Sequence, residues 1–469
     1  MIQKRQSYAL AAFGLIAALL LNSCAPDKPI DTPTTPQTVK SFDSKVVQQW
    51  NNLFLDIERY ATVYRPCPAA RMLGYTGLAV YESCVTGMPD YRTIANRYQN
   101  LVIPPIENGK AYNWAIVSNE VYATMYAKFF EKVTLVNDRQ VDLQKIENLR
   151  QSLDATLVKE NIVEDPSAVE RSRAYGKAVA EAVFAYSATD PYGHDMYLNP
   201  RPKDYVPPVG PGLWQPTEPD KGAAMFPYWG KVRTFAISQT QNICAAPQAS
   251  YSKDKNSLYY IQALEVYNRS MKATQSYEDR WIGEFWSDDL MGFTFSPPVR
   301  WMAIMNQVLV EDKVNMETAI YAAAKVGIAL NDASVGIWNS KFKYNVERPA
   351  SYIRDNIDPT YLSALNFGPA KGNTPSFPAY PSGHSGFGAA AAIALSDVFG
   401  YNYQMIDRCH EGRNDFLGKP RSFYTFTAMA EENAISRVPL GVHWRMDCEE
   451  GYNYGLLIGR EVNKLPFKK

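Results

Sequence analysis

The amino-acid sequence predicts an all-α fold of two packed helical bundles with a long irregular excursion rich in proline. Apolar residues recur at three- and four-residue spacing through most of the chain, which is typical of amphipathic helices. One stretch, residues 190–256, lacks this spacing and concentrates proline, glycine and tryptophan. We find no repeat of solenoid length and no coiled-coil heptads. The length of 469 residues is enough for a large core, and we expect one domain over residues 40–469.

The expected helices account for most of this domain. In residues 40–62 the apolar positions 46, 47, 50, 53, 54, 57 and 61 lie on one helical face. The same reasoning predicts further helices over 68–87, 111–134, 135–162, 166–188, 256–272, 274–290, 298–310, 314–343, 384–399, 422–434 and 439–462. The excursion at 190–256 is longer than a normal connection, so we expect it to wrap the surface or to roof the functional site. It separates an N-terminal half, 40–255, from a C-terminal half, 256–469.

The N-terminus has the pattern of an export signal. Residues 1–23 carry two basic residues and then an apolar run that is too short for a secure membrane span. The run ends in Leu21-Asn22-Ser23-Cys24, which resembles a bacterial lipobox, and residues 24–39 form a tether rich in proline and threonine. We therefore expect an exported bacterial lipoprotein, anchored to the membrane only by lipid on Cys24 and facing the periplasm or the cell surface. The alternative is an ordinary signal peptide. A Cys24→Ser variant that still partitions into membranes would contradict lipidation.

The composition argues against nucleic acid as a partner and does not decide whether the cysteines form disulfides. Lysine plus arginine and aspartate plus glutamate both number 48, so there is no electrostatic case for nucleic acid. Export permits disulfides, and sequence order allows the pairs Cys67–Cys84 and Cys409–Cys448, but free thiols fit equally well. No cysteine and histidine cluster has zinc-site spacing. The oligomeric state is not encoded in any pattern that we find.

Three short segments in the last third of the chain carry the chemistry. They read Lys341-x6-Arg348-Pro349, Pro381-Ser382-Gly383-His384, and Ser436-Arg437-x5-His443-x3-Asp447. Together they supply three cations, a hydroxyl, a glycine amide and two of the four histidines of the chain. Three cations offset the charge of a phosphate-like oxyanion, and guanidinium forks match its oxygens. One histidine can bond to the central atom, and the other can move a proton near neutral pH.

The residues around each segment indicate that the three segments come together at one anion site. Proline stops a helix, so the helix expected at 314–343 ends before Arg348, with Lys341 at its C-terminal end or two turns from Arg348 on one face. Ser382 and Gly383 stand where the next helix begins and would present amides to an anion. His443 and Asp447 are four residues apart on the helix expected from residue 439, so the carboxylate can orient the imidazole. The other two histidines, His194 and His410, are expected on the surface.

This combination resembles the superfamily of type 2 phosphatidic acid phosphatases and vanadium-dependent haloperoxidases, whose three-part signature it matches at every position. Trp338 and Phe377 occupy positions that line the vanadate pocket in the haloperoxidase branch. Segments 211–217, 284–289 and 296–298 are also similar to the bacterial members of that branch. The resemblance spans residues 45–465 and implies the haloperoxidase and acid phosphatase type of helical fold.

The resemblance also implies roles for the site residues. Lys341, Arg348 and Arg437 would bind oxyanion oxygens together with Ser382 and the Gly383 amide. His443 would ligate vanadium or attack phosphorus, His384 would be the acid–base group, and Asp447 would orient His443. Either Asp288 or Asp289 would pair with one of the arginines.

Three functions are compatible with this reading. The first is a haloperoxidase that holds vanadate as its cofactor and uses hydrogen peroxide and halide. The second needs no cofactor: a phosphatase that hydrolyses phosphate monoesters through a phosphohistidine and is inhibited by vanadate. The third is a surface lipoprotein with a non-catalytic oxyanion pocket, which the completeness of the signature disfavours.

Overall fold

The computed structural model of the chain describes residues 37–136, 138–160 and 166–469. The expected signal peptide, Cys24 and most of the expected tether lie outside these residues. Within them, residues 37–469 form one compact unit. Val39, which we placed in the tether, is fully buried, and Trp114 Nε1 donates a hydrogen bond to Gln37 O at 2.9 Å. The packed fold therefore includes residues that the sequence analysis assigned to the tether.

The fold is all-α, as predicted, with one small hairpin added. The helices are α1 (Lys45–Glu58), α2 (Cys67–Cys84), α3 (Trp114–Phe130), α4 (Leu143–Glu160), α5 (Pro166–Ala188), α6 (Leu258–Ser270), α7 (Tyr277–Phe285), α8 (Pro297–Glu311), α9 (Met316–Tyr344), α10 (Pro349–Asn356), α11 (Gly383–Phe399), α12 (Phe426–Ile435) and α13 (Arg445–Asn463). Strands β1 (Met405–Asp407) and β2 (Arg421–Phe423) pair antiparallel, with Met405 opposite Phe423. The hairpin and α10 were not predicted, because each is too short to show periodicity.

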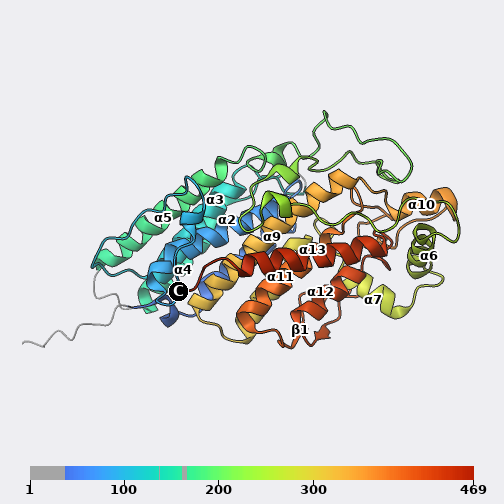
Figure 1. Cartoon of the computed structure of the whole chain (residues 1–469). Coiled ribbons are helices and arrows are strands. Elements are labelled where there is room, and N and C mark those ends of the chain that lie inside the picture. Colours follow the sequence, from blue (N-terminus) through green and yellow to red (C-terminus); the bar gives the residue numbers. More distant parts are fainter. Residues whose placement is uncertain (1–36, 137, 161–165) are drawn as a thin grey trace, which may run out of the picture. The chain divides into compact units, whose positions relative to one another are not determined.

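Helix α9 connects the two bundles. Helices α1 to α5 lie on one side of it and α8, α11, α12 and α13 on the other (Figure 1). α9 packs along α2 at a distance that only glycine permits, since a Cβ on Gly327 would lie 2.4 Å from Leu73 O. α11 packs against α13 in the same way, because a Cβ on Gly455 would lie 2.4 Å from Gly386 O. These contacts hold the site-bearing ends of α9, α11 and α13 in register.

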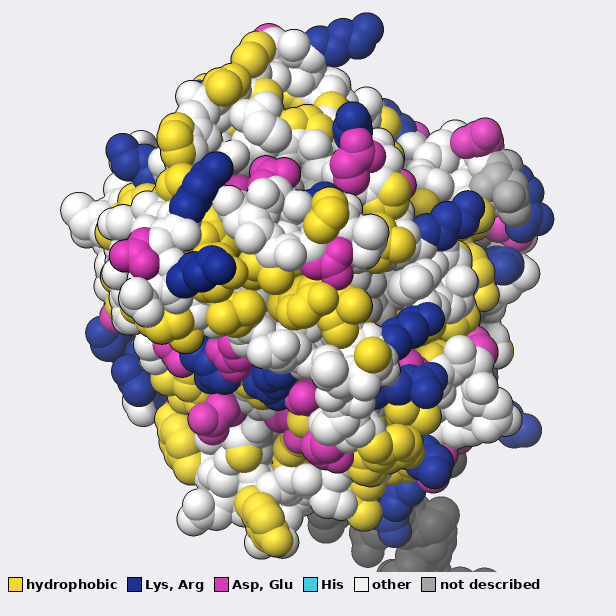
Figure 2. Space-filling view, turned by 90° about the vertical axis from the view of Figure 1, so that its right-hand side faces the viewer, with side chains coloured by type: hydrophobic (Ala, Val, Ile, Leu, Met, Phe, Trp, Pro, Cys, Tyr) yellow, Lys and Arg dark blue, Asp and Glu magenta, His cyan; other side chains and the backbone are white. Residues whose placement is uncertain are grey.

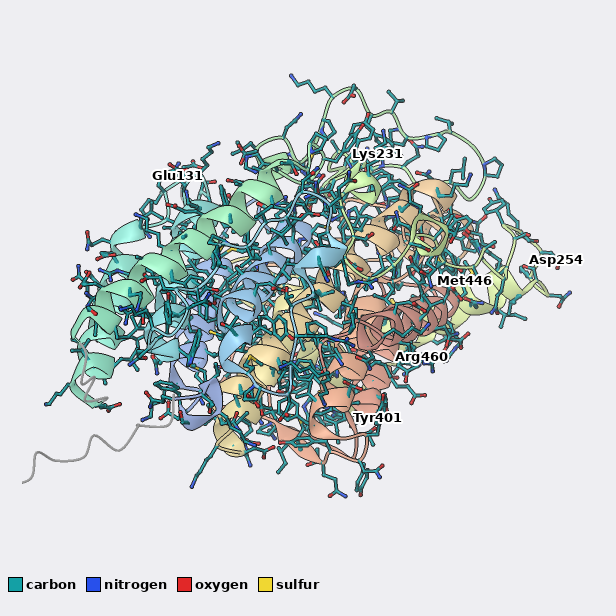
Figure 3. All side chains as sticks on the ribbon, turned by 60° about the vertical axis from the view of Figure 1, so that its left-hand side comes forward. Glu131, Lys231, Asp254, Tyr401, Met446 and Arg460 are labelled. Carbon is teal, nitrogen blue, oxygen red and sulfur yellow. The ribbon has the colours of Figure 1, made fainter. Side chains whose placement is uncertain are left out.

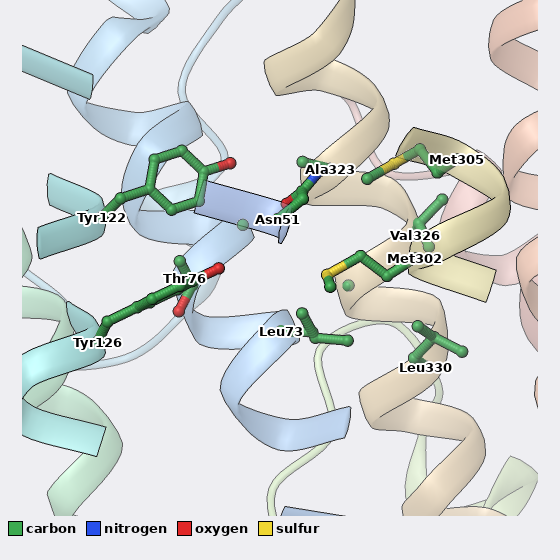
Figure 4. Close-up of a pocket in the computed structure, with 12 residues that line it drawn as sticks. Asn51, Leu73, Thr76, Tyr122, Tyr126, Met302, Met305, Ala323, Val326 and Leu330 are labelled. Carbon is green, nitrogen blue, oxygen red and sulfur yellow. The ribbon is translucent and has the colours of Figure 1, made fainter. Parts of the chain in front are cut away.

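The interface between the bundles is too tightly packed to hold a ligand. A cavity of about 20 Å³ lies among α1, α2, α3, α8 and α9, lined by side chains that include Asn51, Thr76, Tyr122 and Met302 (Figure 4). That volume accommodates about one water molecule. The functional cavity must therefore lie elsewhere, at the ends of the helices.

The irregular excursion is anchored to α9. Asp332 accepts hydrogen bonds from the amides of Phe235, Ala236 and Ile237 at 2.8, 2.7 and 3.0 Å, and Trp229 Nε1 donates to Ser334 Oγ at 2.9 Å. The carboxylate replaces the partners that these amides would have had in regular structure. Figure 3 labels Lys231 and Asp254, from the middle and the end of this segment. The excursion reaches the functional cavity through Arg201, Asp220 and Met225, which line it.

One helix boundary was predicted wrongly, and the structure decides the cysteine pairing that the sequence left open. α13 begins at Arg445, not at residue 439, because Gly441 adopts a left-handed φ of +79° in the preceding loop. The five cysteines in the described part of the chain are all free. Cys67 and Cys84 cannot pair because they stand at opposite ends of α2, 17 residues apart, which is about 25 Å along a helix.

The described residues contain no helix that is both long enough and apolar enough to span a bilayer. On the face turned toward the viewer in Figure 2, acidic, basic and hydrophobic side chains alternate without a large area of one charge. This agrees with the balanced charge of the sequence.

Candidate functional site

The second and third predicted segments reach the wall of one cavity of about 530 Å³, and Arg348 of the first segment lies behind that wall, in contact with His443. Trp338, Phe377, Gly383, His384 and His443 lie on its wall. The rest of the lining comes from the excursion, from the segment before α2, from other loops and from the first turns of α8 and α11. These residues are Thr62, Val63, Arg65, Pro66, Arg201, Asp220, Met225, Asp288, Asp289, Leu290, Met291, Ser296, Pro297, Leu365, Pro369, Ala370, Asn373, Thr374, Pro375, Ser376 and Phe387. A cavity of this size is typical of sites for small organic molecules.

Lys341 lies in the last turn of α9 and is completely buried. Its Nζ donates hydrogen bonds to the carbonyl oxygens of Pro378, Ala379 and Pro381 at 2.9, 2.8 and 2.6 Å. α9 ends three residues later, where Asn345 adopts a left-handed conformation and its amide bonds back to Lys341 O. Lys341 and Arg348 therefore do not share a helical face.

Arg348 is the N-cap residue of α10, just before Pro349, and is also fully buried. Its Nη1 donates to Val442 O at 2.9 Å and to His443 Nε2 at 3.1 Å, and its Nε donates to Phe377 O at 3.1 Å. The guanidinium thus ties the first segment to the third and to the loop that precedes the second. It also lies over the Phe377 ring at 5.1 Å from the ring centroid.

Arg437 pairs with a carboxylate, for which the sequence offered two candidates, Asp288 and Asp289. Its Nη2 pairs with Asp289 Oδ2, its Nη1 donates to Trp286 O at 3.1 Å, and its Nε has no partner. Asp289 Oδ1 lies 3.8 Å from His384 Nε2, which also lacks a hydrogen bond. Asp289 therefore links Arg437 to His384, and both side chains keep a free donor or acceptor.

His443 is oriented by Asp447, as the spacing predicted. Its Nδ1 lies 2.9 Å from Asp447 Oδ2, and the same oxygen accepts the Trp444 amide at 3.1 Å. Because Oδ2 already acts as an acceptor, the shared proton belongs on Nδ1, which leaves a lone pair on Nε2. Nε2 is the atom that Arg348 contacts. His443 precedes α13, so the loop, not the helix, positions its ring.

Burial and mutual repulsion control the charges of these groups. Burial and the Arg348 charge lower the pKa of Lys341 well below its usual range, and burial lowers the pKa of Arg348 to about 9. Burial and the Arg437 charge lower the pKa of His384 to about 3. Burial, together with the charges of Arg348, Lys341 and Arg437, also lowers the pKa of His443 well below 6.5. Both imidazoles are therefore neutral at pH 7 while no anion is bound.

A second buried ionic cluster adjoins the site, and the sequence analysis missed it. Arg300 on α8 is completely buried and donates to Asp407 Oδ2 at 2.8 Å. His410, which we expected on the surface, is 2% exposed and bonds to Arg300 while its ring stacks on Phe295. Asp288 lies 3.7 Å from Arg300 and 3.8 Å from His410. The adjacent aspartates at 288–289 were the only sequence signal for this cluster.

The residues fit a tetrahedral oxyanion. Ser382 caps α11, so the amides at the start of that helix have no intrahelical acceptor, and Gly383 lies on the cavity wall. Arg437 Nε and His384 Nε2 are buried without partners. Unsatisfied buried donors are costly, and a bound oxyanion would satisfy them. Trp338 and Phe377, with ring centroids 4.9 Å apart, form an aromatic wall beside this cradle, as their positions predicted.

Comparisons with known proteins agree with this site. Residues 321–467 match the family model described as the VCPO second helical-bundle domain. The chain is 25% identical to the vanadium chloroperoxidase of Curvularia inaequalis over 514 residues, covering 90% of this chain and 81% of that protein.

Solved structures extend the likeness to both bundles. The crystal structure of the first bacterial vanadium-dependent iodoperoxidase matches with a TM-score of 0.76 and 26% identity, covering 90% of this chain and 96% of that one. The holo-type bacterial vanadium-dependent chloroperoxidase shares the fold, with a TM-score of 0.65 and 15% identity over 90% of this chain and 98% of that one. The chain is therefore similar over both bundles to vanadium-dependent haloperoxidases, and its second bundle matches the family model of their second helical-bundle domain.

Proposed function

We propose that this protein is a vanadium-dependent haloperoxidase that oxidises halide with hydrogen peroxide. The observation that carries the proposal is a neutral His443 whose Nε2 lies 3.1 Å from Arg348 Nη1, whose Nδ1 is braced by Asp447, and whose pKa is lowered by burial and by the charges of Arg348, Lys341 and Arg437. The Trp338 and Phe377 wall and the names of the relatives, which include a chloroperoxidase and an iodoperoxidase, support the haloperoxidase over the phosphatase.

The residues divide the work between binding and proton transfer. Lys341, Arg348 and Arg437 would hold the oxyanion together with Ser382 and the Gly383 amide, and His443 would ligate vanadium. When bound, vanadate would supply the Lewis-acid centre that activates hydrogen peroxide toward halide. Burial and, after it, the Arg437 charge keep the pKa of His384 near 3. The anion would offset that charge, so His384 could then hold a proton beside the oxyanion.

The test is a titration of purified protein with orthovanadate. We expect vanadate to raise the melting temperature, since a ligand at 100 times its Kd stabilises the fold by about 2.7 kcal/mol. We also expect vanadate-dependent bromination of a phenol-type dye in the presence of peroxide and bromide, with phosphate as an inhibitor. Hydrolysis of p-nitrophenyl phosphate that is blocked by vanadate, without bromination, would instead establish the phosphatase. A thermal shift without either reaction would favour the non-catalytic pocket.

A further inference from the structure

Helix α6 holds the start of α13, just after the loop that presents His443. On α6, Gln262 Oε1 accepts the amide hydrogen of Met446 at 3.1 Å. Three residues further along the same helix, the Glu265 carboxylate accepts a hydrogen bond from Arg445 Nε at 2.8 Å. Residues three apart lie on one face of a helix, so one face of α6 fixes the chain immediately after His443.

Tyr259 lies one turn earlier on α6 and connects two of the signature segments. Its hydroxyl donates to Glu347 Oε1 at 3.1 Å, and its ring packs on the Trp444 indole with the centroids 4.4 Å apart. Trp444 Nε1 donates to Glu347 O at 2.8 Å, which closes a buried triangle of three residues. Glu347 directly precedes Arg348, and Trp444 directly follows His443. The triangle therefore joins the chain neighbours of two residues whose side chains are 3.1 Å apart.

The Tyr259–Glu347–Trp444 triangle can act on the site only through other residues. None of its three members, all in the described part of the chain, lines the cavity. Arg348 Nη1 divides its hydrogen bonds between Val442 O and His443 Nε2. A small displacement of the loop at 442–444 would change both bonds, since hydrogen bonds weaken steeply as their geometry departs from the ideal.

We propose that Tyr259 is a positioning residue: through the triangle it holds Arg348 and His443 at the separation that a bound oxyanion requires. Asp447 orients the ring of His443, whereas Tyr259 fixes the first signature segment against the third. The inference rests on the oxyanion-binding role proposed above for Arg348 and His443, and it applies to a phosphatase as much as to a haloperoxidase.

The test measures the Kd for orthovanadate by calorimetry, with Tyr259→Phe as the first variant. This change removes the hydroxyl that bonds to Glu347 and keeps the ring that packs on Trp444. We expect the Kd to rise about three- to tenfold, less than the roughly 10–100-fold typical of residues that contact a metal ligand directly. In bromination, the half-saturating vanadate concentration should rise in parallel. The kcat at saturating vanadate should change little, because the bound oxyanion then helps to hold the two residues together.

Two variants of Glu347 test the same bond without any change to Tyr259. The amide oxygen in Glu347→Gln can still accept the Tyr259 hydroxyl, whereas the side chain in Glu347→Leu cannot. Both variants remove the same carboxylate, so the difference between them reports the hydrogen bond. We expect Glu347→Leu to weaken vanadate binding more than Glu347→Gln does. The double variant Tyr259→Phe/Glu347→Leu should bind vanadate no more weakly than either single variant, because both changes remove one interaction.

Tyr267→Phe is the matched control for a merely structural role. Tyr267 also lies on α6, and its hydroxyl also donates to a carboxylate, Asp358 Oδ2, at 3.0 Å. That bond ties α6 to the segment after α10 and not to the triangle. Figure 1 shows α6 and α10 beside each other. Tyr267→Phe should leave the Kd for vanadate unchanged, whatever its effect on the melting temperature of the vanadate-free protein.

Three results would overturn the inference: wild-type vanadate binding in Tyr259→Phe, an equal loss of affinity in Tyr267→Phe, or equal losses in the two Glu347 variants. A wild-type protein that binds neither vanadate nor phosphate would overturn it together with the proposed function. Absence of bromination, with vanadate binding that still depends on Tyr259, would refute the proposed function alone.

Discussion

Replacement of His443 by alanine is expected to abolish turnover while leaving the anion site in place. His443 presents Nε2 to the cradle while Asp447 holds its proton on Nδ1, so its loss removes the ligand or nucleophile itself. We expect a fall in kcat of roughly 10³-fold or more, as when other covalent catalysts are removed. The three cations remain, so vanadate or phosphate should still raise the melting temperature.

Asp447→Asn is the matched control for His443→Ala. It keeps the shape of the side chain but weakens the bond that fixes the proton on Nδ1 of His443. Loss of an orienting partner of a metal ligand typically costs 10–100-fold, so the effect should be intermediate. Steady-state kinetics at saturating vanadate, with circular dichroism to verify folding, measure both variants. Wild-type rates in His443→Ala with any accepted substrate would show that the assigned ligand or nucleophile is wrong.

Replacement of His384 by alanine is expected to give the second largest loss. Its Nε2 is buried, unbonded and on the cavity wall, where it can exchange a proton with a bound oxyanion or its partner. Removal of a general acid–base group typically costs about 10²–10⁴-fold in kcat. The loss should appear in kcat more than in the Kd for vanadate, because three cations still supply most of the attraction.

Asp289→Asn tests whether His384 transfers a proton, because it changes the surroundings of the imidazole without removing it. It leaves the imidazole but weakens the pairing with Arg437 and removes a charge 3.8 Å from Nε2. Because that charge raises the pKa of His384, its removal should shift the limb of the pH–rate profile that reports His384 to lower pH without eliminating activity. An unchanged profile in Asp289→Asn, together with a normal kcat in His384→Ala, would remove His384 from the mechanism.

The sequence by itself determined the class of fold and supplied the residues that we assign to the cradle. The three- and four-residue spacing of apolar residues predicted nearly all the helices, because this local spacing is what places the apolar residues on the one face that a helix buries. Lys341, Ser382 and His443 were identifiable because the chemistry of an oxyanion demands cations, amides and an imidazole, and each signature segment is short and local. The His443–Asp447 contact also followed from spacing, although a loop rather than the expected helix presents His443.

Tertiary packing decided the rest. The choice of Asp289 over Asp288 as the partner of Arg437 depends on how the loop after α7 meets the loop before α13, which no local pattern encodes. His410 became a buried partner of Arg300 because α8 and the segment after β1 meet around an aromatic cluster. The burial of Asp288 and Ser296 likewise appears only in the tertiary structure, because long-range contacts decide which polar residues are enclosed.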